Sequence, residues 1–145
     1  MPIGAVLARK SEVLAESFWK GAERGLLAHP DSVVLRDVDQ WIDFPGRREA
    51  TLYVTMEPCL MCMGTAMSFF LGRIVYAMPA NADGASTVAD VWAPAAGHPS
   101  TRGAYAVPVV EGGLYEAEAR QLIAQWLQIG VTGGEAEFAR QLLGL

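Results

Sequence analysis

The chain has 145 residues, which favours a single domain covering residues 1–145. Hydrophobic residues make up 52% of it and charged residues 19%, which excludes a disordered polymer and favours a globule with a well-filled core. The net charge of −5, without a basic stripe, argues against a dedicated nucleic-acid binder, because such proteins neutralise phosphates with clustered Lys and Arg.

The chain opens with the pattern of a β-hairpin. Residues 2–8, PIGAVLA, are an apolar run that predicts a buried strand. Residues 12–18, EVLAESF, alternate in part and predict its hairpin partner across Lys10–Ser11. Residues 21–25 predict a loop.

From residue 31 onward, helical and strand patterns alternate. Apolar residues at helical spacing predict a helix over 31–42, which Pro45–Gly46 would end. The elements expected after it are a central strand over 50–56, a helix over 59–71, a strand over 73–78, loops around a short helix near 88–92, a strand over 104–110, and helices over 114–127 and 135–143. This alternation predicts an α/β sheet with helices on both faces.

No charged segment followed by an apolar run opens the chain, so we expect no signal peptide. The longest nearly apolar stretch, Cys59–Leu71, is too short and too interrupted by polar residues to span a bilayer. Because the chain has two cysteines and no export signal, we expect a cytoplasmic protein without membrane contact.

The two cysteines, Cys59 and Cys62, stand in the stretch MEPCLMCMG, and their spacing is compatible with several roles. A disulfide between them would close a very small loop and stabilise little. A thioredoxin-like redox pair has the same spacing after a strand, and buried core cysteines are a further alternative. A C-x-x-C pair by itself therefore leaves these roles open.

The expected position of the cysteines at the start of a helix favours a metal. Residues i and i+3 share one helix face. The N–H groups and the positive dipole end of a helix N-terminus stabilise thiolates. Two thiolates are half of a tetrahedral zinc shell, so at least one further ligand must come from elsewhere.

The chain has two histidines that could complete such a site, and each precedes a proline. His29 stands just ahead of a predicted helix with Asp31 two residues later, whereas His98 lies in a segment rich in Pro and Gly. His29 is therefore the better ligand candidate. A histidine in a surface loop is the alternative for both.

These motifs together resemble a known family. His29-Pro30-Asp31 followed by Pro58-Cys59-Leu60-Met61-Cys62 resembles the H-x-E…P-C-x-x-C signature of zinc-dependent deaminases. The run TLYVTMEPCLMCMGTAM followed by GRIVYA is similar to the cytidine deaminase-like superfamily, in the branch of tRNA adenosine deaminases and guanine deaminases. Residues 2–8 resemble the family's first strand, and residues 109–126 resemble its last strand and helix.

The resemblance implies a three-layer α/β/α sandwich with a five-stranded mixed sheet. It implies Zn²⁺ held by His29, Cys59 and Cys62, with water as the fourth ligand. Asp31 would be the catalytic carboxylate that moves protons during hydrolysis of an exocyclic amine on a nucleobase or nucleoside. A homodimer is also implied. The candidate substrate contacts are Phe18, Ala28 and Glu57.

The chain departs from the family pattern in three ways. Asp31 stands where the family has Glu, so proton transfer needs a closer backbone or becomes slower. The family's substrate-binding asparagine after the second strand is missing near residues 17–19, which predicts a pocket that recognises the base more by stacking. The helix that precedes the first strand in the family is also missing, so we expect either that the start is truncated or that another element or a subunit covers that sheet face.

The leading expectation is a hydrolytic deaminase of a free base or nucleoside, because the acidic charge balance favours small substrates over nucleic acid. A non-catalytic, zinc-bearing partner subunit is an alternative, since some relatives have lost the glutamate. A tRNA adenosine deaminase is another alternative, against which the missing basic tail argues.

Overall fold

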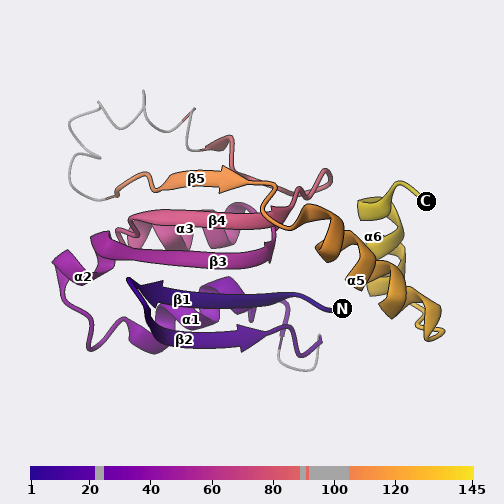
Figure 1. Cartoon of the computed structure of the whole chain (residues 1–145), viewed down its shortest axis with the longest axis horizontal. Helices are drawn as coiled ribbons and strands as arrows, with labels where there is room; N and C mark the ends of the chain where they lie inside the picture. The colour runs from indigo at the N-terminus through magenta and orange to yellow at the C-terminus, as the bar shows by residue number, and fades with distance from the viewer. Residues whose placement is uncertain (22–24, 89–90, 92–104) are drawn as a thin grey trace.

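A computed structural model describes residues 1–21, 25–88, 91 and 105–145 of the chain. Within these residues, five strands form one sheet in the order β2-β1-β3-β4-β5 (Figure 1). The strands are β1 Gly4–Arg9, β2 Glu12–Phe18, β3 Ala50–Met56, β4 Arg73–Met78 and β5 Val109–Gly112. β1 pairs antiparallel with β2 and β3, whereas β3, β4 and β5 are parallel, so the sheet is mixed.

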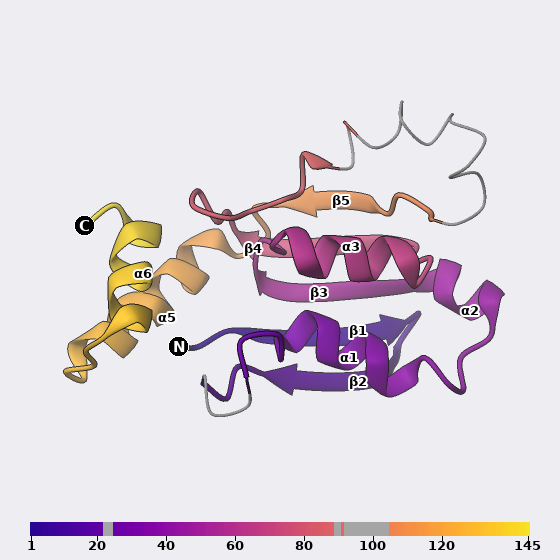
Figure 2. The same cartoon turned by 180° about the vertical axis from the view of Figure 1, so that it is seen from behind.

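Helices lie against both faces of this sheet. They are α1 Pro30–Val38, α2 Phe44–Glu49, α3 Leu60–Ser68, α5 Glu116–Gln128 and α6 Gly134–Leu143. α1 and α3 lie side by side on one face (Figure 2). α5 packs against β4 and runs with α6 past the end of the sheet where residue 1 lies (Figures 1 and 2). The third layer, to which α5 belongs, therefore covers only one end of the sheet face opposite α1 and α3.

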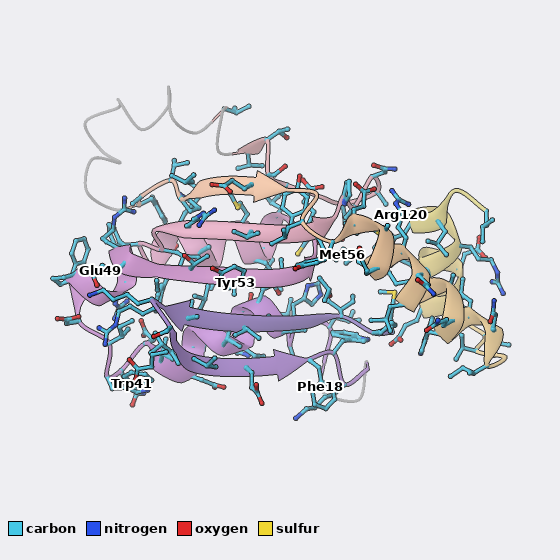
Figure 3. The ribbon with its side chains drawn as sticks, in the orientation of Figure 1. Phe18, Trp41, Glu49, Tyr53, Met56 and Arg120 are labelled. Atoms are coloured by element: carbon cyan, nitrogen blue, oxygen red, sulfur yellow. The ribbon has the colours of Figure 1, made fainter. Side chains whose placement is uncertain are left out.

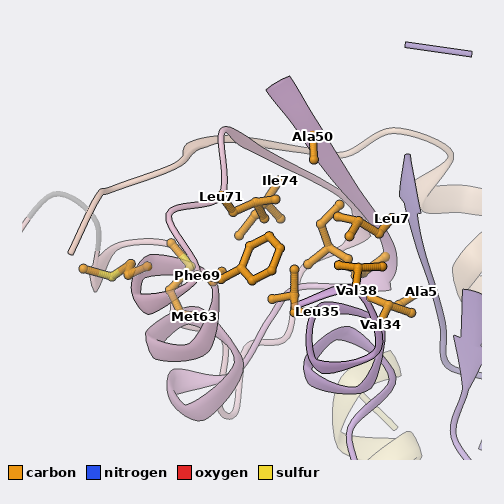
Figure 4. Packing of buried hydrophobic residues seen from close by; sticks show 14 of the residues in the cluster. Ala5, Leu7, Val34, Leu35, Val38, Ala50, Met63, Phe69, Leu71 and Ile74 are labelled. Atoms are coloured by element: carbon orange, nitrogen blue, oxygen red, sulfur yellow. The ribbon is translucent and has the colours of Figure 1, made fainter. Parts of the chain in front are cut away.

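The main core lies between the sheet and the layer of α1 and α3 (Figure 4). Leu7, Leu52 and Ile74 stand in register on neighbouring strands and are at most 1% exposed. α1 contributes Val34 and Val38, spaced one helical turn apart, to the same cluster. Because burial of each large apolar side chain contributes about 1.5–3 kcal/mol, this core fixes the positions of both helices on the sheet.

The opposite face of the sheet is covered less completely. Tyr53 follows Leu52 on β3, points to this face and is 41% exposed (Figure 3). A shallow groove on the face is lined by Val6, Tyr53 and Val75 from the strands and by Leu122 from α5.

The predicted α/β class and the five-stranded mixed sheet are confirmed, and the strands over 12–18, 50–56 and 73–78 have the predicted bounds. The last strand begins later than predicted, at Val109, and residue 104 lies outside the described residues. The helix expected near 88–92 also lies largely outside them. Among the described residues, no helix combines the length and the apolar character that a bilayer span requires.

The prediction around residues 31–46 was wrong in one respect. α1 ends at Val38, and Pro45–Gly46 does not stop a helix but lies in the first turn of α2. The Asp43 side chain caps α2 by accepting a hydrogen bond from the Gly46 N–H at 2.9 Å. A proline is tolerated in the first turn because its missing N–H has no helical partner there.

Candidate metal centre and pocket

Two helix N-termini meet at the end of the sheet where β3 finishes. The chain leaves β3 at Met56 and enters α3 with Cys59 as the N-cap residue, so Cys62 lies in the first turn. His29 is the N-cap residue of α1, and Asp31 lies in its first turn. α1 and α3 pack against each other, which brings these four side chains together. The carboxyl ends of parallel strands are the usual place for sites in α/β proteins.

The distances among three of these side chains fit a zinc ion. Nδ1 of His29 lies 3.5 Å from Sγ of Cys59 and 3.5 Å from Sγ of Cys62, and the two sulfurs are 3.6 Å apart. Tetrahedral zinc with bonds of about 2.3 Å to sulfur and about 2.0–2.1 Å to nitrogen separates two sulfurs by about 3.8 Å and sulfur from nitrogen by about 3.6 Å. One His and two Cys are a donor set that zinc prefers, and they leave one coordination position open.

Asp31 lies beside this donor set and lines the same cavity. It is 8% exposed, and its Oδ1 accepts hydrogen bonds from the Cys62 thiol at 3.0 Å and from the Ser32 N–H at 3.2 Å. The Ser32 hydroxyl donates to Sγ of Cys62 at 3.3 Å. The acid predicted to carry protons is therefore held in place next to the predicted ligands.

The two sulfurs differ in their readiness to ionise. Hydrogen bonding with Cys62, and then with His29, lowers the pKa of Cys59 to about 4, so it is a thiolate at neutral pH. The neighbouring Cys59 sulfur and burial raise the pKa of Cys62. The hydrogen bond with Cys59 raises the pKa of His29, and burial raises the pKa of Asp31. A metal that uses all three ligands must therefore displace protons.

A cavity of about 480 Å³ opens at the metal centre, a volume ordinary for small-molecule sites. Its walls are mostly apolar, and the lining residues include Ile3, Trp19, Val54, Met56 and Phe138. The cavity also contains carboxylates, contributed by Asp31, Glu57, Asp83 and Glu135. Such a cavity suits a flat, largely apolar ring that carries a few polar groups.

Trp19 forms the wall next to the predicted histidine ligand. Its ring meets the His29 ring edge-on, with centroids 5.5 Å apart and planes at 85°. Its indole N–H donates to Oε1 of Glu135 on α6 at 2.9 Å, and this hydrogen bond lowers the pKa of Glu135. The indole N–H is thus already used, and Trp19 presents ring surface to the cavity.

Glu57 holds the turn over residues 80–86 against the cavity. It is 9% exposed, and its two oxygens accept hydrogen bonds from the Ala80 N–H at 3.0 Å and from the Ser86 N–H at 3.0 Å. The Ser86 hydroxyl also donates to it at 2.5 Å. Both Glu57 oxygens therefore already accept hydrogen bonds from the turn that carries Asp83. The sequence analysis named Glu57 as a candidate substrate contact, and these hydrogen bonds occupy its carboxylate.

The structure places the other two candidate substrate contacts away from this cavity. Phe18 alternates with Trp19, so it points to the groove on the opposite sheet face, where it is 62% exposed with the Lys20 ammonium 5.0 Å from its ring centroid. The Ala28 N–H donates to the Gly25 carbonyl at 3.1 Å, and Ala28 is not among the lining residues. His98 lies outside the described residues.

The sequence analysis did not single out Trp19, Asp83, Glu135 or Phe138 as cavity residues. The missing asparagine near residues 17–19 was the signal for Trp19, which stands at that point of the chain. No local pattern marks the other three residues, because a turn and a distant helix bring them to the cavity.

Comparison with known proteins places this site in a family. Residues 1–78 match the family model of the cytidine and deoxycytidylate deaminase zinc-binding region. This span contains His29, Asp31 and both cysteines. The chain belongs to this family. The resemblance noted in the sequence is thereby confirmed, and Zn²⁺ is confirmed as the metal, since the matched region binds zinc and the His/Cys/Cys group fits it.

Several relatives of this deaminase-family chain have names that refer to tRNA. A tRNA(Ile)-lysidine synthase of Deinococcus radiodurans is 32% identical over 128 residues, which are 86% of this chain and 21% of that protein. A tRNA-specific adenosine deaminase of Agrobacterium fabrum is 30% identical over 131 residues, 88% of this chain and 81% of that protein. A solved structure from a study of A-to-I editing by tRNA:A34 deaminases has a TM-score of 0.64 and 29% identity, covering 83% of each chain.

The match covers only part of several of these proteins. It spans about a fifth of the lysidine synthase and about half of other curated relatives that it matches. Family membership therefore fixes the zinc-binding deaminase domain, and the activity and substrate of this chain rest on its own site.

Proposed function

We propose that this chain is a zinc-dependent hydrolase that removes the exocyclic amine of a nucleobase and releases ammonia. The observation that carries the proposal is the group of His29, Cys59 and Cys62, which has the spacing of a zinc site and opens on a cavity beside the Asp31 carboxylate. We also propose that residues 1–145 act as one domain. The homodimer stays a prediction.

The three ligand residues would hold the ion, and a bound zinc would supply a Lewis acid that lowers the pKa of a water molecule to about 7. Asp31 accepts a proton from the attacking water and passes protons to the ring nitrogen and to the leaving amine. Water and the amine-bearing base thus become a carbonyl-bearing base and ammonia. The proximity of Asp31 to Cys62 sets where this proton carrier stands.

The walls of the cavity orient the base. Trp19, Met56 and Phe138 offer apolar surface on which a planar ring can pack and from which water is excluded. The edge-on contact of Trp19 with His29 places this surface next to the metal centre. Recognition therefore relies on shape and stacking more than on the amide hydrogen bonds that an asparagine would provide.

Two observations bear on the substrate. The tRNA-specific relatives favour adenosine in tRNA, which the sequence analysis ranked below small molecules. The carboxylates of the cavity and the net charge of −5 favour an uncharged nucleoside over a phosphate-rich ligand. We propose that adenosine is the group that reacts. Adenosine within tRNA is the first substrate to test, and free adenosine is the second.

A substrate panel tests this proposal. Zinc-loaded protein is incubated with an anticodon stem-loop RNA, adenosine, adenine, guanine and cytidine, and ammonia and product bases are quantified. We expect equal amounts of ammonia and deaminated base from at least one adenosine substrate, and none from the Asp31→Ala variant. Absence of ammonia from every substrate with zinc-loaded protein would contradict the proposal.

The shorter acid at position 31 supports a second candidate, a non-catalytic zinc-bearing partner subunit. Asp31 is one methylene shorter than the family's Glu, so its reach to the reacting atoms is reduced. The same panel run with the Asp31→Glu variant separates the candidates. Activity in the variant but not in the natural chain would favour the partner subunit.

A further inference from the structure

We propose that Ser32 is a positioning residue of the metal centre, whose hydroxyl donates a hydrogen bond to the sulfur of Cys62 and so stabilises that sulfur as a zinc ligand. Ser32 is neither a ligand nor the proton carrier, and it acts on the ion through Cys62. The inference rests on the proposed function only where it concerns turnover, because an effect on metal binding needs no substrate.

The side chain of Ser32 reaches across from one helix to the next. Ser32 lies in the first turn of α1, and its Oγ is 3.3 Å from Sγ of Cys62 in the first turn of α3. A serine hydroxyl near a helix N-terminus commonly bonds to the backbone of its own helix. Within the described residues, this hydroxyl bonds instead to the sulfur on the neighbouring helix. The sequence thus directs a buried donor at a ligand atom.

The two ligand sulfurs have different surroundings. Cys59 lines the cavity, whereas Cys62 is 2% exposed and does not line it. Ser32 is 5% exposed and is likewise not a lining residue. A hydroxyl behind the ligand does not touch a substrate in the cavity. Any effect of Ser32 on the reaction therefore passes through the groups that it contacts.

Cys62 needs a hydrogen-bond donor when it binds a metal. With its proton in place, the Cys62 thiol donates to Oδ1 of Asp31 at 3.0 Å. A zinc ligand is a thiolate, so the sulfur then has no proton to donate and faces a carboxylate oxygen and the Cys59 sulfur, 3.6 Å away. A buried charge without a partner is costly, and a hydrogen bond to an ion is stronger than one between neutral groups. The Ser32 hydroxyl supplies this bond and thereby favours the metal-bound form.

The backbone of Ser32 contacts the proton carrier as well. Its N–H donates at 3.2 Å to Oδ1 of Asp31, the oxygen that also accepts from Cys62. Groups behind the ligands that orient them contribute about 10–100-fold to metal affinity or activity. Because a side-chain substitution keeps the N–H, loss of the hydroxyl tests the contact with the sulfur separately.

The first measurement is the zinc affinity of the full chain, determined by competition with a chromogenic chelator. We expect Ser32→Ala to lower this affinity about 10–100-fold. Ser32→Thr keeps a hydroxyl and should retain most of the affinity. The matched control is Ser68→Ala, which removes from α3 a hydroxyl that donates to the Gly64 carbonyl at 2.9 Å, and its zinc affinity should equal that of the natural chain.

Cobalt(II) in place of zinc gives a readout that a general loosening of α1 would not move. Cobalt(II) binds the same kinds of nitrogen and sulfur ligand, and its thiolate complexes absorb through charge transfer from sulfur to metal. A hydrogen bond to the sulfur lowers the energy of its lone pairs, so loss of the bond moves this absorption to longer wavelength. We expect the shift in Ser32→Ala, and we expect no shift in Ser32→Thr or Ser68→Ala.

Two outcomes would overturn the inference: a natural zinc affinity in Ser32→Ala, or an affinity that falls while the cobalt absorption stays in place. Neither measurement uses a substrate, so both decide the role of Ser32 even when no substrate in the panel releases ammonia and the proposed function fails. With a substrate that reacts, kcat of zinc-saturated Ser32→Ala should fall while KM stays unchanged, because Ser32 does not line the cavity. A rise in KM alone would contradict action through the metal centre.

Discussion

The inner and outer walls of the cavity are built in different ways. The inner wall, formed by His29, Asp31, Cys59 and Cys62, comes from two adjacent helix N-termini that rest on the main core. The outer wall comes from three separate segments: Trp19 after β2, Asp83 in the turn after β4, and Glu135 and Phe138 on α6. The inner wall lies wholly within the family match of residues 1–78, whereas most of the outer wall lies beyond it.

We therefore expect the inner wall to carry out the reaction and the outer wall to select the substrate. The inner wall lies within the zinc-binding region matched by the family model, and in the proposed function it would carry out hydrolysis at the zinc centre. The outer wall departs from the family pattern, with Trp19 near the position of the family's asparagine. Variants of the inner wall should therefore abolish metal binding or turnover, whereas variants of the outer wall should change affinity and selectivity.

The largest effect is expected from Cys62→Ala in the inner wall. The variant removes one of two sulfurs from a donor set of three and leaves Cys59 and His29 to hold the ion alone. We expect zinc to fall from one per chain to a small fraction of that, measured by elemental analysis after dialysis. Unchanged zinc content would mean that the ion binds elsewhere. Ser68→Ala on the exposed face of α3 is a suitable control.

The next effect is expected from Asp31→Ala, which removes the proton carrier and keeps all three ligand residues. We expect kcat to fall about 10²–10⁴-fold while zinc stays bound, because general acid–base groups contribute on that scale. Asp31→Glu should preserve or raise turnover. A collapse of Asp31→Glu to the level of the Ala variant would show that the cavity is shaped for the shorter acid.

The affinity for zinc should depend steeply on pH. The raised pKa of Cys62 means that this thiol holds its proton in the metal-free chain, and the raised pKa of His29 extends the protonated range of its ring to higher pH, whereas Cys59 with a pKa of about 4 is ionised. Zinc must displace those protons, so its affinity should rise with pH, about tenfold per pH unit for each proton released. Calorimetry in two buffers of different ionisation enthalpy counts the protons. Binding without proton release would contradict this ionisation pattern.

A smaller effect is expected from Trp19→Ala in the outer wall. The variant removes the ring that lines the cavity beside His29, so we expect KM to rise about tenfold with a lesser change in kcat. Trp19→Phe keeps an aromatic surface, so its KM should lie between that of Trp19→Ala and that of the natural chain. A loss of kcat with unchanged KM would mean that Trp19 acts in the chemical step. It would contradict the expectation that outer-wall variants change affinity and selectivity.

The smallest effect is expected from Glu135→Gln, which weakens the contact between α6 and Trp19. The lowered pKa of Glu135 means that the contact stabilises the fold above the ordinary glutamate pKa and is lost as pH falls through the lowered pKa in the folded chain. Because the side chain is 37% exposed, the loss at neutral pH should be below about 1 kcal/mol. Thermal unfolding at several pH values measures it, and a difference that grows toward acid pH would contradict the sign.

The sequence predicted that the inner-wall residues lie together, because the signals for this are local. A proline and two cysteines after a β-branched run define a helix N-terminus, and His29 precedes a second one. The outer wall has no such signal, since Asp83 and Phe138 reach the cavity through tertiary packing. Phe18 was chosen from its place in the chain, and strand alternation gives that wall to Trp19 instead.

The zinc–ligand distances in the metal-loaded protein test the central claim most directly. X-ray absorption at the zinc edge should show two sulfur atoms at about 2.3 Å and nitrogen or oxygen atoms at about 2.0–2.1 Å. The sulfur signal should be halved in a Cys59→Ser variant reconstituted with excess zinc. A shell without sulfur, or one with four sulfurs shared between chains, would contradict a mononuclear centre formed by His29, Cys59 and Cys62.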